Sequence, residues 1–372
     1  MKKFVLVPDS FKGTLSATRI CEIMRAEILR AFPSAQVLSI PVADGGEGSV
    51  DCFLTACGGE KVFVDCNGPY MENIRAYYGV LPNGVAVVET ASAAGLPMVE
   101  GRANPAKTTT YGVGQLLLHA VKSGAKKIIL GLGGSCTNDF GCGAACACGA
   151  RFFDSDGNAF IPTGETLYRV AGLDLSGLRT ALAGVELIAT CDVDNPPYGA
   201  RGAARVYAKQ KGADEQTVEM LDEGVRSICE VASNTLGVKL HALAGGGAAG
   251  AFGAGVVAFF GGKLQSGIDT VLETVGFSKA IENADLVFTG EGKLDAQSLR
   301  GKVVVGVAKV CKKAGVRTIA VVGGADEDLQ EAYESGLTAV FTINRLPQDL
   351  SISKAYSAEN LAFTMRNILR LF

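Results

Sequence analysis

Apolar and amphipathic runs alternate over the first sixty residues of the chain. The apolar runs Phe4–Pro8 and Gln36–Val42 have the length and composition of strands. Ser16–Phe32 and Glu47–Cys57 have helical spacing. Strands separated by helices predict a parallel, doubly wound sheet, which binds ligands at the carboxyl ends of its strands. The loops that follow the two apolar runs are therefore candidate sites.

The last ninety residues repeat this alternation. Strand-like runs lie at 284–292, 317–325 and 337–343, and helix-like runs lie at 302–315 and 358–371. We therefore expect both ends of the chain to build one sheet.

The middle of the chain has a different pattern. Strand-like runs at 60–66, 73–81 and 84–91 are joined by short turns, of which 82–84 (Pro-Asn-Gly) is a hairpin signal. Two more strands are expected within "KKIILGLGGS" and "GVELIATCDV". At 372 residues, two domains are the natural expectation. We predict an α/β fold in which residues 63–284 form a second α/β domain, inserted into a parallel-sheet domain of residues 1–62 and 285–372, with the active site in the cleft between them.

Composition excludes several classes of protein. The formal net charge is −3 and no run of Lys and Arg exceeds two residues, so nucleic acid is not an expected partner. Eleven cysteines follow an N-terminus that does not have the pattern of a signal peptide. We therefore expect reduced thiols and a cytoplasmic location.

Residues Ala242–Gly262 include no charged side chain and have the length of a membrane span. The three consecutive glycines at 245–247, and the low content of Leu and Ile, favour a buried glycine-rich loop that enters a tightly packed helix. We expect no membrane association.

Glycine clusters in three stretches, 131–139, 243–255 and 288–298. Glycine loops that connect a strand to a helix can bind anions through backbone N–H groups, and phosphate binding is the functional interpretation. Turns and close helix packing are the alternative. The chain has neither the spacing of a P-loop nor a dinucleotide-binding fingerprint.

Polar residues follow most of the expected strands. They are Asp9, Ser10 and Lys12, then Asp44 and Glu47, then Asn138 and Asp139, then Asp192, and finally Glu291, Lys293 and Asp295. Phosphoryl transfer needs lysines on the phosphates, carboxylates on Mg²⁺ and a carboxylate near the attacking hydroxyl, so this set favours a kinase. Helix caps and Asx turns are the structural alternative. Two functional alternatives to a kinase also stay open: a non-catalytic sensor of nucleotides or sugar acids, and a nicotinamide-dependent oxidoreductase.

Histidine and cysteine chemistry are not expected. His119 and His241 are the only histidines, and both are predicted to be packing or surface residues. Cys142 and Cys146 fall on one face of a helix and are predicted to be small core residues. "DSDGN", at 154–158, is predicted to be a turn.

Ordered motifs along nearly the whole chain resemble the bacterial glycerate kinases of the two-domain type without a P-loop. They include "VLVPDSFKGTLSA", "PVADGGEGSV", "NPAKTTTYGVGQLL", "GLGGSCTNDFGCGA", "CDVDNPPYGARGAARVYAKQKGA" and "ADLVFTGEGKLDAQSLRGK". The resemblance implies ATP-dependent phosphorylation of D-glycerate with Mg²⁺ in organic acid and glyoxylate metabolism, with 2-phosphoglycerate favoured over 3-phosphoglycerate. It also implies a Rossmann-like domain interrupted by a domain of restriction-endonuclease-like topology.

Residue roles follow as predictions from these motifs. We expect Ser10, Lys12 and Lys211 to bind anionic oxygens, and Asp44, Glu47 and Asp192 to share Mg²⁺ coordination and alignment of the hydroxyl. The remaining predicted substrate or phosphate contacts are Gly133, Gly134, Ser135, Asn138, Gly245, Gly246, Gly247 and Glu291. The chain has Ala208-Lys209 where the family often has Gly-Pro, which leaves the role of Lys209 open. A homodimer and a different hydroxy-acid substrate also stay open.

Overall fold

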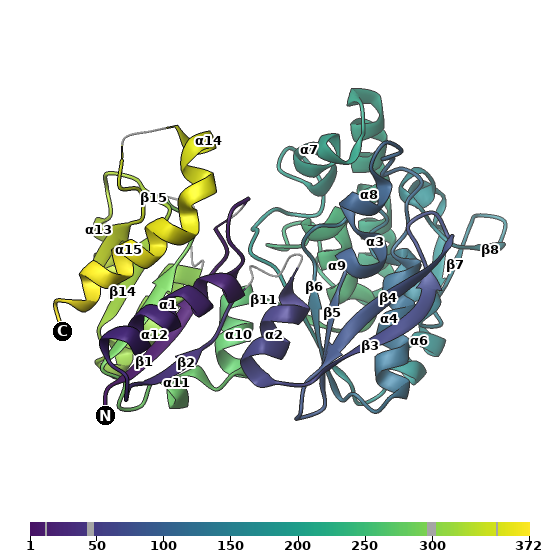
Figure 1. The fold of residues 1–372 in the computed structure, drawn as a ribbon. Coiled ribbons are helices and arrows are strands. Elements are labelled where there is room, and N and C mark those ends of the chain that lie inside the picture. The colour runs from purple at the N-terminus through teal and green to yellow at the C-terminus, as the bar shows by residue number, and fades with distance from the viewer. Residues whose placement is uncertain (12, 43–47, 296–302, 347–348) are drawn as a thin grey trace. The chain divides into compact units, whose positions relative to one another are not determined.

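The structure is a computed structural model that describes residues 1–372 except 12, 43–47, 296–302 and 347–348 (Figure 1). The chain divides into two compact units. The first takes in residues 1–42, 51–58 and the described part of 266–372, and the second takes in 48–50 and 59–265. Each unit has its own sheet and its own hydrophobic core.

The first unit is built on a five-stranded sheet to which both ends of the chain contribute. Its strands are β1 (Lys3–Pro8), β2 (Gln36–Ser39), β12 (Leu286–Gly290), β14 (Thr318–Val322) and β16 (Ala339–Thr342). All of them are parallel, in the order β16-β14-β12-β1-β2. Every residue of β12 and β14 is buried, because helices cover both faces of a parallel sheet.

This strand order has a topological switch point between β1 and β12. Numbered along the chain, the five strands lie in the order 2-1-3-4-5, which is the flavodoxin-like arrangement. The chain leaves β1 toward one side of the sheet and leaves β12 toward the other. Doubly wound sheets bind ligands outside the carboxyl ends of the two strands at such a point.

The helices of the first unit are α1 (Ala17–Ala31), α2 (Ser49–Cys57), α10 (Gly267–Thr274), α11 (Phe277–Ala280), α12 (Val303–Ala314), α13 (Gln330–Ser335), α14 (Leu350–Ser353) and α15 (Ser357–Leu369), with the 3₁₀ turn η5 (Lys354–Tyr356). Helices α1 and α12 pack directly on strands of this sheet. A short pair, β13 (Lys293–Leu294) and β15 (Gly324–Ala325), completes the unit.

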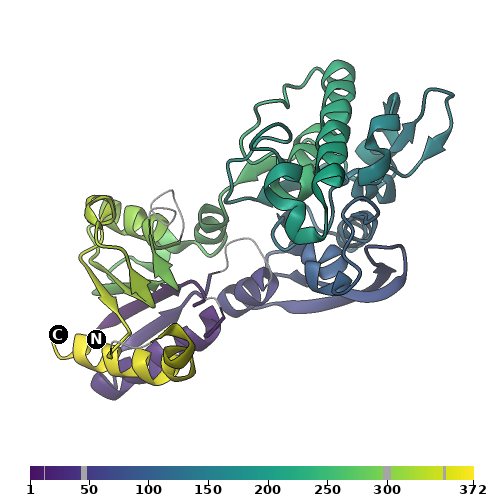
Figure 2. The same cartoon turned by 90° about the horizontal axis from the view of Figure 1, so that it is seen from above.

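Helix α1 shows why the sequence forms a helix at this place. The side chain of Ser16 caps it by accepting a hydrogen bond from the Arg19 N–H, and Ile20, Met24 and Ile28 recur every fourth residue and are fully buried. It lies beside α15 (Figure 1). The two chain ends also meet in this unit, where the Lys2 ammonium donates to the backbone oxygen of Phe372 (Figure 2).

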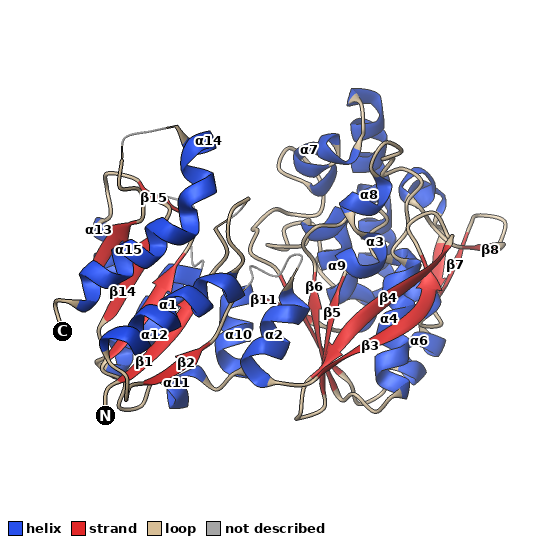
Figure 3. Cartoon of the chain, viewed as in Figure 1, coloured by secondary structure: helices blue, strands red, loops and turns tan. Residues whose placement is uncertain are grey.

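The second unit is built on a six-stranded mixed sheet. Its strands in spatial order are β11 (Lys263–Gln265), β10 (Glu186–Thr190), β6 (Lys127–Gly131), β5 (Val85–Glu89), β4 (Asn73–Val80) and β3 (Glu60–Asn67). The first four are parallel, while β4 and β3 form an antiparallel hairpin, drawn as two long arrows side by side in Figure 3. The predicted turn before β5 is present, with Gly84 at a φ of 77°.

Helices and short segments complete the second unit. The helices are α3 (Ala91–Ala94), α4 (Tyr111–Lys122), α5 (Cys142–Ala147), α6 (Ser176–Ala181), α7 (Ala203–Tyr207), α8 (Glu215–Leu236) and α9 (Ala248–Phe260). The 3₁₀ turns are η1 (Leu96–Val99), η2 (Gly164–Arg169) and η3 (Lys209–Lys211), and a small sheet joins β7 (Arg151–Phe153), β8 (Ala159–Phe160) and β9 (Gly172–Asp174).

The apolar stretch 242–262 forms a glycine-rich loop followed by α9, as the sequence predicted. The helix is only thirteen residues long and most of its side chains are buried in the core of the second unit. Within the described ranges, no helix has both the length and the apolar character that crossing a bilayer requires.

The predicted fold class is confirmed: the structure is α/β, with a parallel sheet that both chain ends form. The second boundary between the compact units falls after Gln265, earlier than the position 284 expected from the sequence. Helices α10 and α11 account for this difference, since they precede β12 and α10 packs on α12, where Ile268 contacts Gly306.

Candidate active site

The first unit places two predicted site residues at its topological switch point. Ser10 follows β1, and the buried Glu291 follows β12, the neighbouring strand. The Asp9 N–H donates to the Gly290 oxygen at 2.8 Å, and the Asp9 carboxylate accepts from the Ser10 N–H at 2.6 Å. The predicted residues Lys12, Asp44 and Glu47 lie outside the described residues.

The second unit gathers polar residues at the carboxyl ends of its parallel strands. Glu89, Gly131 and Thr190 end three neighbouring strands and are opposite one another in register. The loop after β5 and the loop after β6 run together, because the Leu96 N–H donates to Gly134 at 2.8 Å and the Cys136 N–H donates to Ala94 at 2.9 Å. The predicted residues 133–135 and Asn138 belong to the second of these loops.

Lys211 is the buried cation of this edge. It is only 3% exposed, and its ammonium donates to the Ser135 hydroxyl at 3.0 Å and to the Thr137 backbone oxygen at 2.8 Å. Both partners are neutral oxygens. Burial lowers the pKa of Lys211 from 10.5 to about 8, although the charge of Asp139 opposes this shift. The structure therefore holds together two of the residues predicted to bind anions, Lys211 and Ser135.

Lys209, two residues earlier, has a different environment. Its ammonium forms an ion pair with Glu215 at 2.5 Å, and both side chains are exposed. This arrangement assigns Lys209 to the surface.

Asp139 anchors the loop and is not available to a ligand. Its fully buried carboxylate accepts hydrogen bonds from the N–H and hydroxyl of Thr110, both at 2.8 Å, from Gly141 N–H at 3.1 Å and from Gly143 N–H at 3.3 Å. Thr109 donates a fifth, at 3.3 Å. Burial raises the pKa of Asp139, while these hydrogen bonds act in the opposite direction. The carboxylate thus holds the residues that follow Asn138.

Two of the predicted glycine clusters use their backbone N–H groups differently. No carbonyl of the described residues accepts a hydrogen bond from the N–H groups of Gly133, Gly134 or Ser135. By contrast, the N–H groups of Gly246 and Gly247 donate to the oxygens of Leu243 and Asn195, at 3.0 and 2.9 Å. The first cluster can receive an anion, whereas Gly246 and Gly247 of the second use their N–H groups in packing; the N–H of Gly245 has no carbonyl partner among the described residues.

The packing role of the second cluster is steric. A Cβ on Gly247 would lie 2.5 Å from the backbone oxygen of Pro196, and a Cβ on Gly246 would lie 2.9 Å from that of Leu243. These glycines bring their chain close to the loop that follows β10 and so shape this edge indirectly.

A left-handed turn at the start of α9 supports the loop after β6. Ala249, Gly250 and Ala251 have φ values of 53°, 67° and 67°, and Phe140 has a φ of 59°. Phe140 donates its N–H to the Gly250 oxygen at 3.1 Å, and a Cβ on Gly250 would lie 2.1 Å from the Thr137 oxygen. Residues other than glycine rarely adopt such values, and they concentrate at functional sites.

Asp192 follows β10 at the same edge and is exposed. Mg²⁺ prefers oxygen ligands and is commonly held by one or two carboxylates together with substrate phosphates and water. Among the residues that the structure describes, no group of three His, Cys, Asp or Glu side chains could hold a metal ion by itself. Asp192 offers carboxylate oxygens of the kind that Mg²⁺ prefers, and the other predicted ligands, Asp44 and Glu47, lie outside the described residues.

Cys142 is buried, Cys146 is half-buried and His241 is exposed. All eleven cysteines are free thiols, and burial raises the pKa of Cys142 and Cys146. His119 belongs to helix α4, and its Nδ1 lies 3.1 Å from the hydroxyl of Tyr78.

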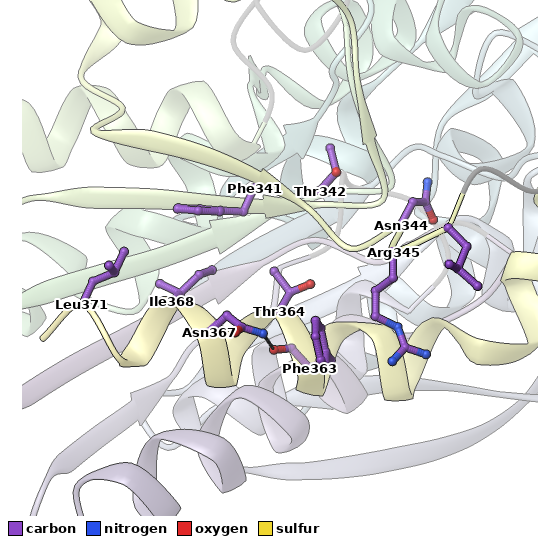
Figure 4. A pocket seen from close by; sticks show the side chains of 10 residues that line it. Phe341, Thr342, Asn344, Arg345, Phe363, Thr364, Asn367, Ile368 and Leu371 are labelled. Atoms are coloured by element: carbon purple, nitrogen blue, oxygen red, sulfur yellow. Dashed lines mark hydrogen bonds between the residues drawn. The ribbon is translucent and has the colours of Figure 1, made fainter.

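A groove of about 610 Å³ lies in the first unit, between β16 and α15. Figure 4 shows the side chains that line it. Its lining residues are Phe341, Thr342, Asn344, Arg345, Leu346, Phe363, Thr364, Asn367, Ile368 and Leu371. The Arg345 guanidinium donates to Asn360 and stacks on Phe363, and Asn367 donates to the Phe363 oxygen. None of these lining residues was predicted to bind substrate.

Sequence reasoning missed the residues that hold the site in place. Thr108 donates its hydroxyl to the Cys136 oxygen at 2.9 Å, and Thr109 and Thr110 bind Asp139. The signal was the unusual triplet of threonines at 108–110, which we used only as part of a resemblance.

Comparisons with known proteins agree over the whole chain. The family model "Glycerate kinase family" matches residues 4–372. A glycerate kinase of Bacillus cereus is 40% identical over 368 residues, which are 98% of this chain and 97% of that protein. A glycerate 2-kinase of Escherichia coli is 38% identical over 368 residues, with the same two coverages.

The agreement extends to a solved structure. A crystal structure from Salmonella typhimurium, provisionally named glycerate kinase 2, superposes with a TM-score of 0.88 at 37% identity. The match covers 100% of this chain and 98% of that one. The chain therefore belongs to the glycerate kinase family.

Proposed function

We propose that the chain transfers the γ-phosphoryl group of ATP to O2 of D-glycerate, as a cytoplasmic enzyme of organic acid metabolism. The family match and the full-length relatives named glycerate kinase support the substrate. The Escherichia coli relative, named glycerate 2-kinase, supports O2 over O3 as the acceptor.

The observation that carries the proposal is the buried Lys211 at the carboxyl edge of the second unit. Its single positive charge faces neutral oxygens, and the neighbouring N–H groups of 133–135 have no carbonyl partner among the described residues. A single buried cation matches a single carboxylate, because opposite charges attract strongly where water is excluded. A triphosphate would need more cations than Lys211, the one buried lysine of the described residues, can supply. Lys211 therefore binds the carboxylate of glycerate, and Ser135 orients the ammonium.

The remaining predicted residues handle the phosphoryl group. Ser10 and Lys12, after β1, bind phosphate oxygens, and Glu291 lies at the same switch point. A carboxylate, Asp44 or Asp192, accepts the proton of the attacking hydroxyl while O2 bonds to the γ-phosphorus and the bond from that phosphorus to ADP breaks.

Glu47 and Asp192 would hold Mg²⁺. When bound, the ion neutralises charge on the phosphates of ATP. The protein's own part is to align the O2 hydroxyl with the γ-phosphate and to keep the glycerate carboxylate fixed while the transfer occurs.

The test is ADP release by the purified chain with ATP, Mg²⁺ and D-glycerate, with L-glycerate, tartronate and glycolate as parallel substrates. We expect turnover with D-glycerate, and phosphorus NMR of the product should identify 2-phosphoglycerate. No turnover with D-glycerate, or a product that is only 3-phosphoglycerate, would contradict the proposal.

A further inference from the structure

Two neighbouring loops of the second unit contain buried polar side-chain atoms without a hydrogen-bond partner among the described residues. These atoms are the hydroxyl oxygens of Thr90, Ser92 and Thr137 and both polar atoms of the Asn138 amide. Thr90 and Thr137 are fully buried, and Asn138 is 1% exposed. Native structures satisfy nearly all such groups, so each exception calls for an explanation.

The loops that carry these atoms lie side by side. Thr90 and Ser92 follow β5, and Thr137 and Asn138 follow β6, its parallel neighbour. The Thr90 N–H donates to the Gly131 oxygen at 2.8 Å, and Gly95 and Ser135 form a bridge farther along. This edge is the one at which Lys211 binds Ser135.

The backbone around Asn138 is fixed on both sides. The Thr137 oxygen accepts from Lys211, and Asp139 accepts hydrogen bonds from the Thr110 segment. Gly250 packs against the Asn138 backbone, since a Cβ there would lie 2.4 Å from the Asn138 Cα. These neighbouring contacts fix the position of the Asn138 backbone. The side-chain amide of Asn138 makes none of them and stays available to a ligand.

The chemistry of the open atoms differs from that of Lys211. Hydroxyl and amide groups are neutral, and each can both donate and accept a hydrogen bond. An alcohol group has the same two capacities, so these atoms suit a neutral hydroxyl, whereas Lys211 suits a carboxylate. A hydroxy acid with a second hydroxyl carries both features.

We propose that Asn138, assisted by the Thr137 hydroxyl, determines specificity by binding the substrate hydroxyl that is not phosphorylated. This inference rests on the proposed function and names the substrate class of its site: short acids with a second hydroxyl beside the reacting one. A site built to bind a substrate hydroxyl rejects an analogue without it by about 10⁴-fold, because its buried polar atoms then stay unpaired.

The experiment compares D-glycerate with D-lactate, which keeps the carboxylate and the reacting hydroxyl and has a methyl group in place of the hydroxymethyl. The wild-type protein should prefer D-glycerate in kcat/KM by about 10³-fold or more. Asn138→Leu, which is similar in size, should lower kcat/KM for D-glycerate by about 100-fold and change that for D-lactate by less than about threefold. Thr137→Val should also lower kcat/KM for D-glycerate and leave that for D-lactate nearly unchanged, but by a smaller factor than Asn138→Leu. This variant keeps the backbone oxygen that accepts a hydrogen bond from Lys211.

Thr318→Val is the matched control, because the Thr318 hydroxyl is also buried, with no acceptor or donor oxygen or nitrogen beside it among the described residues, but lies at the start of β14 near the Cys311 thiol. It should leave the preference for D-glycerate unchanged. Equal losses on both substrates in Asn138→Leu and Thr137→Val, or a wild-type preference below about tenfold, would overturn the inference.

A direct binding measurement separates this inference from the proposed function. Calorimetric titration of D-glycerate and D-lactate into the wild-type protein and the two variants needs no turnover. If phosphorus NMR shows that O3 is the acceptor, the proposed function fails; the unphosphorylated hydroxyl is then O2, and 3-hydroxypropionate, which lacks that hydroxyl, replaces D-lactate in the titration. Equal affinity of the wild-type protein for D-glycerate and for the analogue without the unphosphorylated hydroxyl would contradict the inference in either case.

Discussion

The parallel strands of the two sheets end in carboxyl edges of different construction. In the first unit, Ser10 and Glu291 lie where the strand order reverses, so topology alone identifies the place. In the second unit, Lys211 reaches the edge from η3, and it lies there because Ser135 and Thr137 accept its hydrogen bonds. The first edge follows from the order of strands and the second from packing between segments far apart in the chain.

The difference teaches where each edge is vulnerable. The second edge depends on a buried carboxylate, a left-handed turn and glycines that allow backbones to approach closely. Single substitutions at these supports should therefore impair the second edge without affecting the first. Substitutions at the first edge should change the handling of ATP and leave glycerate binding intact.

The largest effect is expected from Asp139→Ala. The substitution leaves buried donors of Thr110 and Gly141 without an acceptor, and each such loss costs about 1–3 kcal/mol. The free energy of unfolding of the second unit should fall by about 3 kcal/mol or more. Hydrogen exchange should then accelerate in peptides from β5 and β6 and stay unchanged in peptides from β12 and β14.

Asp174→Ala is the control for this prediction, because Asp174 is a half-buried aspartate at the end of β9, in the same unit, that accepts a hydrogen bond from the Ser176 N–H. Equal acceleration of hydrogen exchange in both units, or no change in either, would contradict the prediction that Asp139 stabilises the second unit.

Gly250→Ala should be the next most damaging change. The new Cβ would lie 2.1 Å from the Thr137 oxygen, so the loop of Thr137 and Asn138 must move. Overpacking of this kind costs about 1–3 kcal/mol beyond the strain of a positive φ. We expect a loss of glycerate affinity of about tenfold or more, measured by titration.

Gly261→Ala provides the matched control at the end of the same helix. Gly261 also has a positive φ, of 62°, but a Cβ there would have nothing within 4 Å. If both variants lose the same affinity, backbone strain and not the contact with Thr137 is responsible.

Glu291→Gln tests the first edge. If Glu291 acts on the phosphoryl group, kcat/KM for ATP should fall by about 10–100-fold, the loss typical of one charged contact. The dissociation constant for D-glycerate should stay within about twofold of the wild-type value. Glu331→Gln, on the exposed surface of α13, should change neither quantity. If Glu291→Gln weakened D-glycerate binding as much as it lowered kcat/KM for ATP, the proposal that the first edge handles ATP and the second binds glycerate would be wrong.

The smallest predicted effect is a pH dependence at the second edge. Lys211 loses its charge as pH rises through its pKa of about 8, so glycerate binding should weaken above that pH. The value of kcat/KM for D-glycerate should fall about tenfold between pH 7 and pH 9, since this quantity reports groups of the free enzyme. If kcat/KM for D-glycerate stayed constant between pH 7 and pH 9, a group other than Lys211 would bind the glycerate carboxylate.

Much of the fold could be predicted from the sequence, because its signals are local. The run Phe4–Pro8 covers all of β1 except its first residue, the run 126–135 contains β6, and the turn before β5 has the predicted glycine. The boundary at Gln265 was missed, since the packing of α10 on α12 is a contact between segments that no local pattern reveals. Our prediction that the site lies in a cleft between the two domains stays a prediction.

The candidate site was predictable only in part. Glycine loops and strand-end polar residues pointed to 133–135 and Asn138, and the family resemblance pointed to Lys211, but these signals could not distinguish an open N–H from one used in packing. Gly246 and Gly247 belong to the second kind, as their hydrogen bonds to Leu243 and Asn195 show. The anchoring role of Asp139 depends on Thr110, which is twenty-nine residues away in the chain.

The most direct test of the account is calorimetric titration of D-glycerate into wild-type protein, Lys211→Met and Lys209→Met. The two lysines are two positions apart, but only Lys211 is buried against Ser135 and Thr137. The account predicts that Lys211→Met weakens D-glycerate binding by about 100-fold or more, as expected for the loss of a buried charged contact, and that Lys209→Met binds like the wild-type protein. Wild-type affinity in a folded Lys211→Met protein would contradict the account.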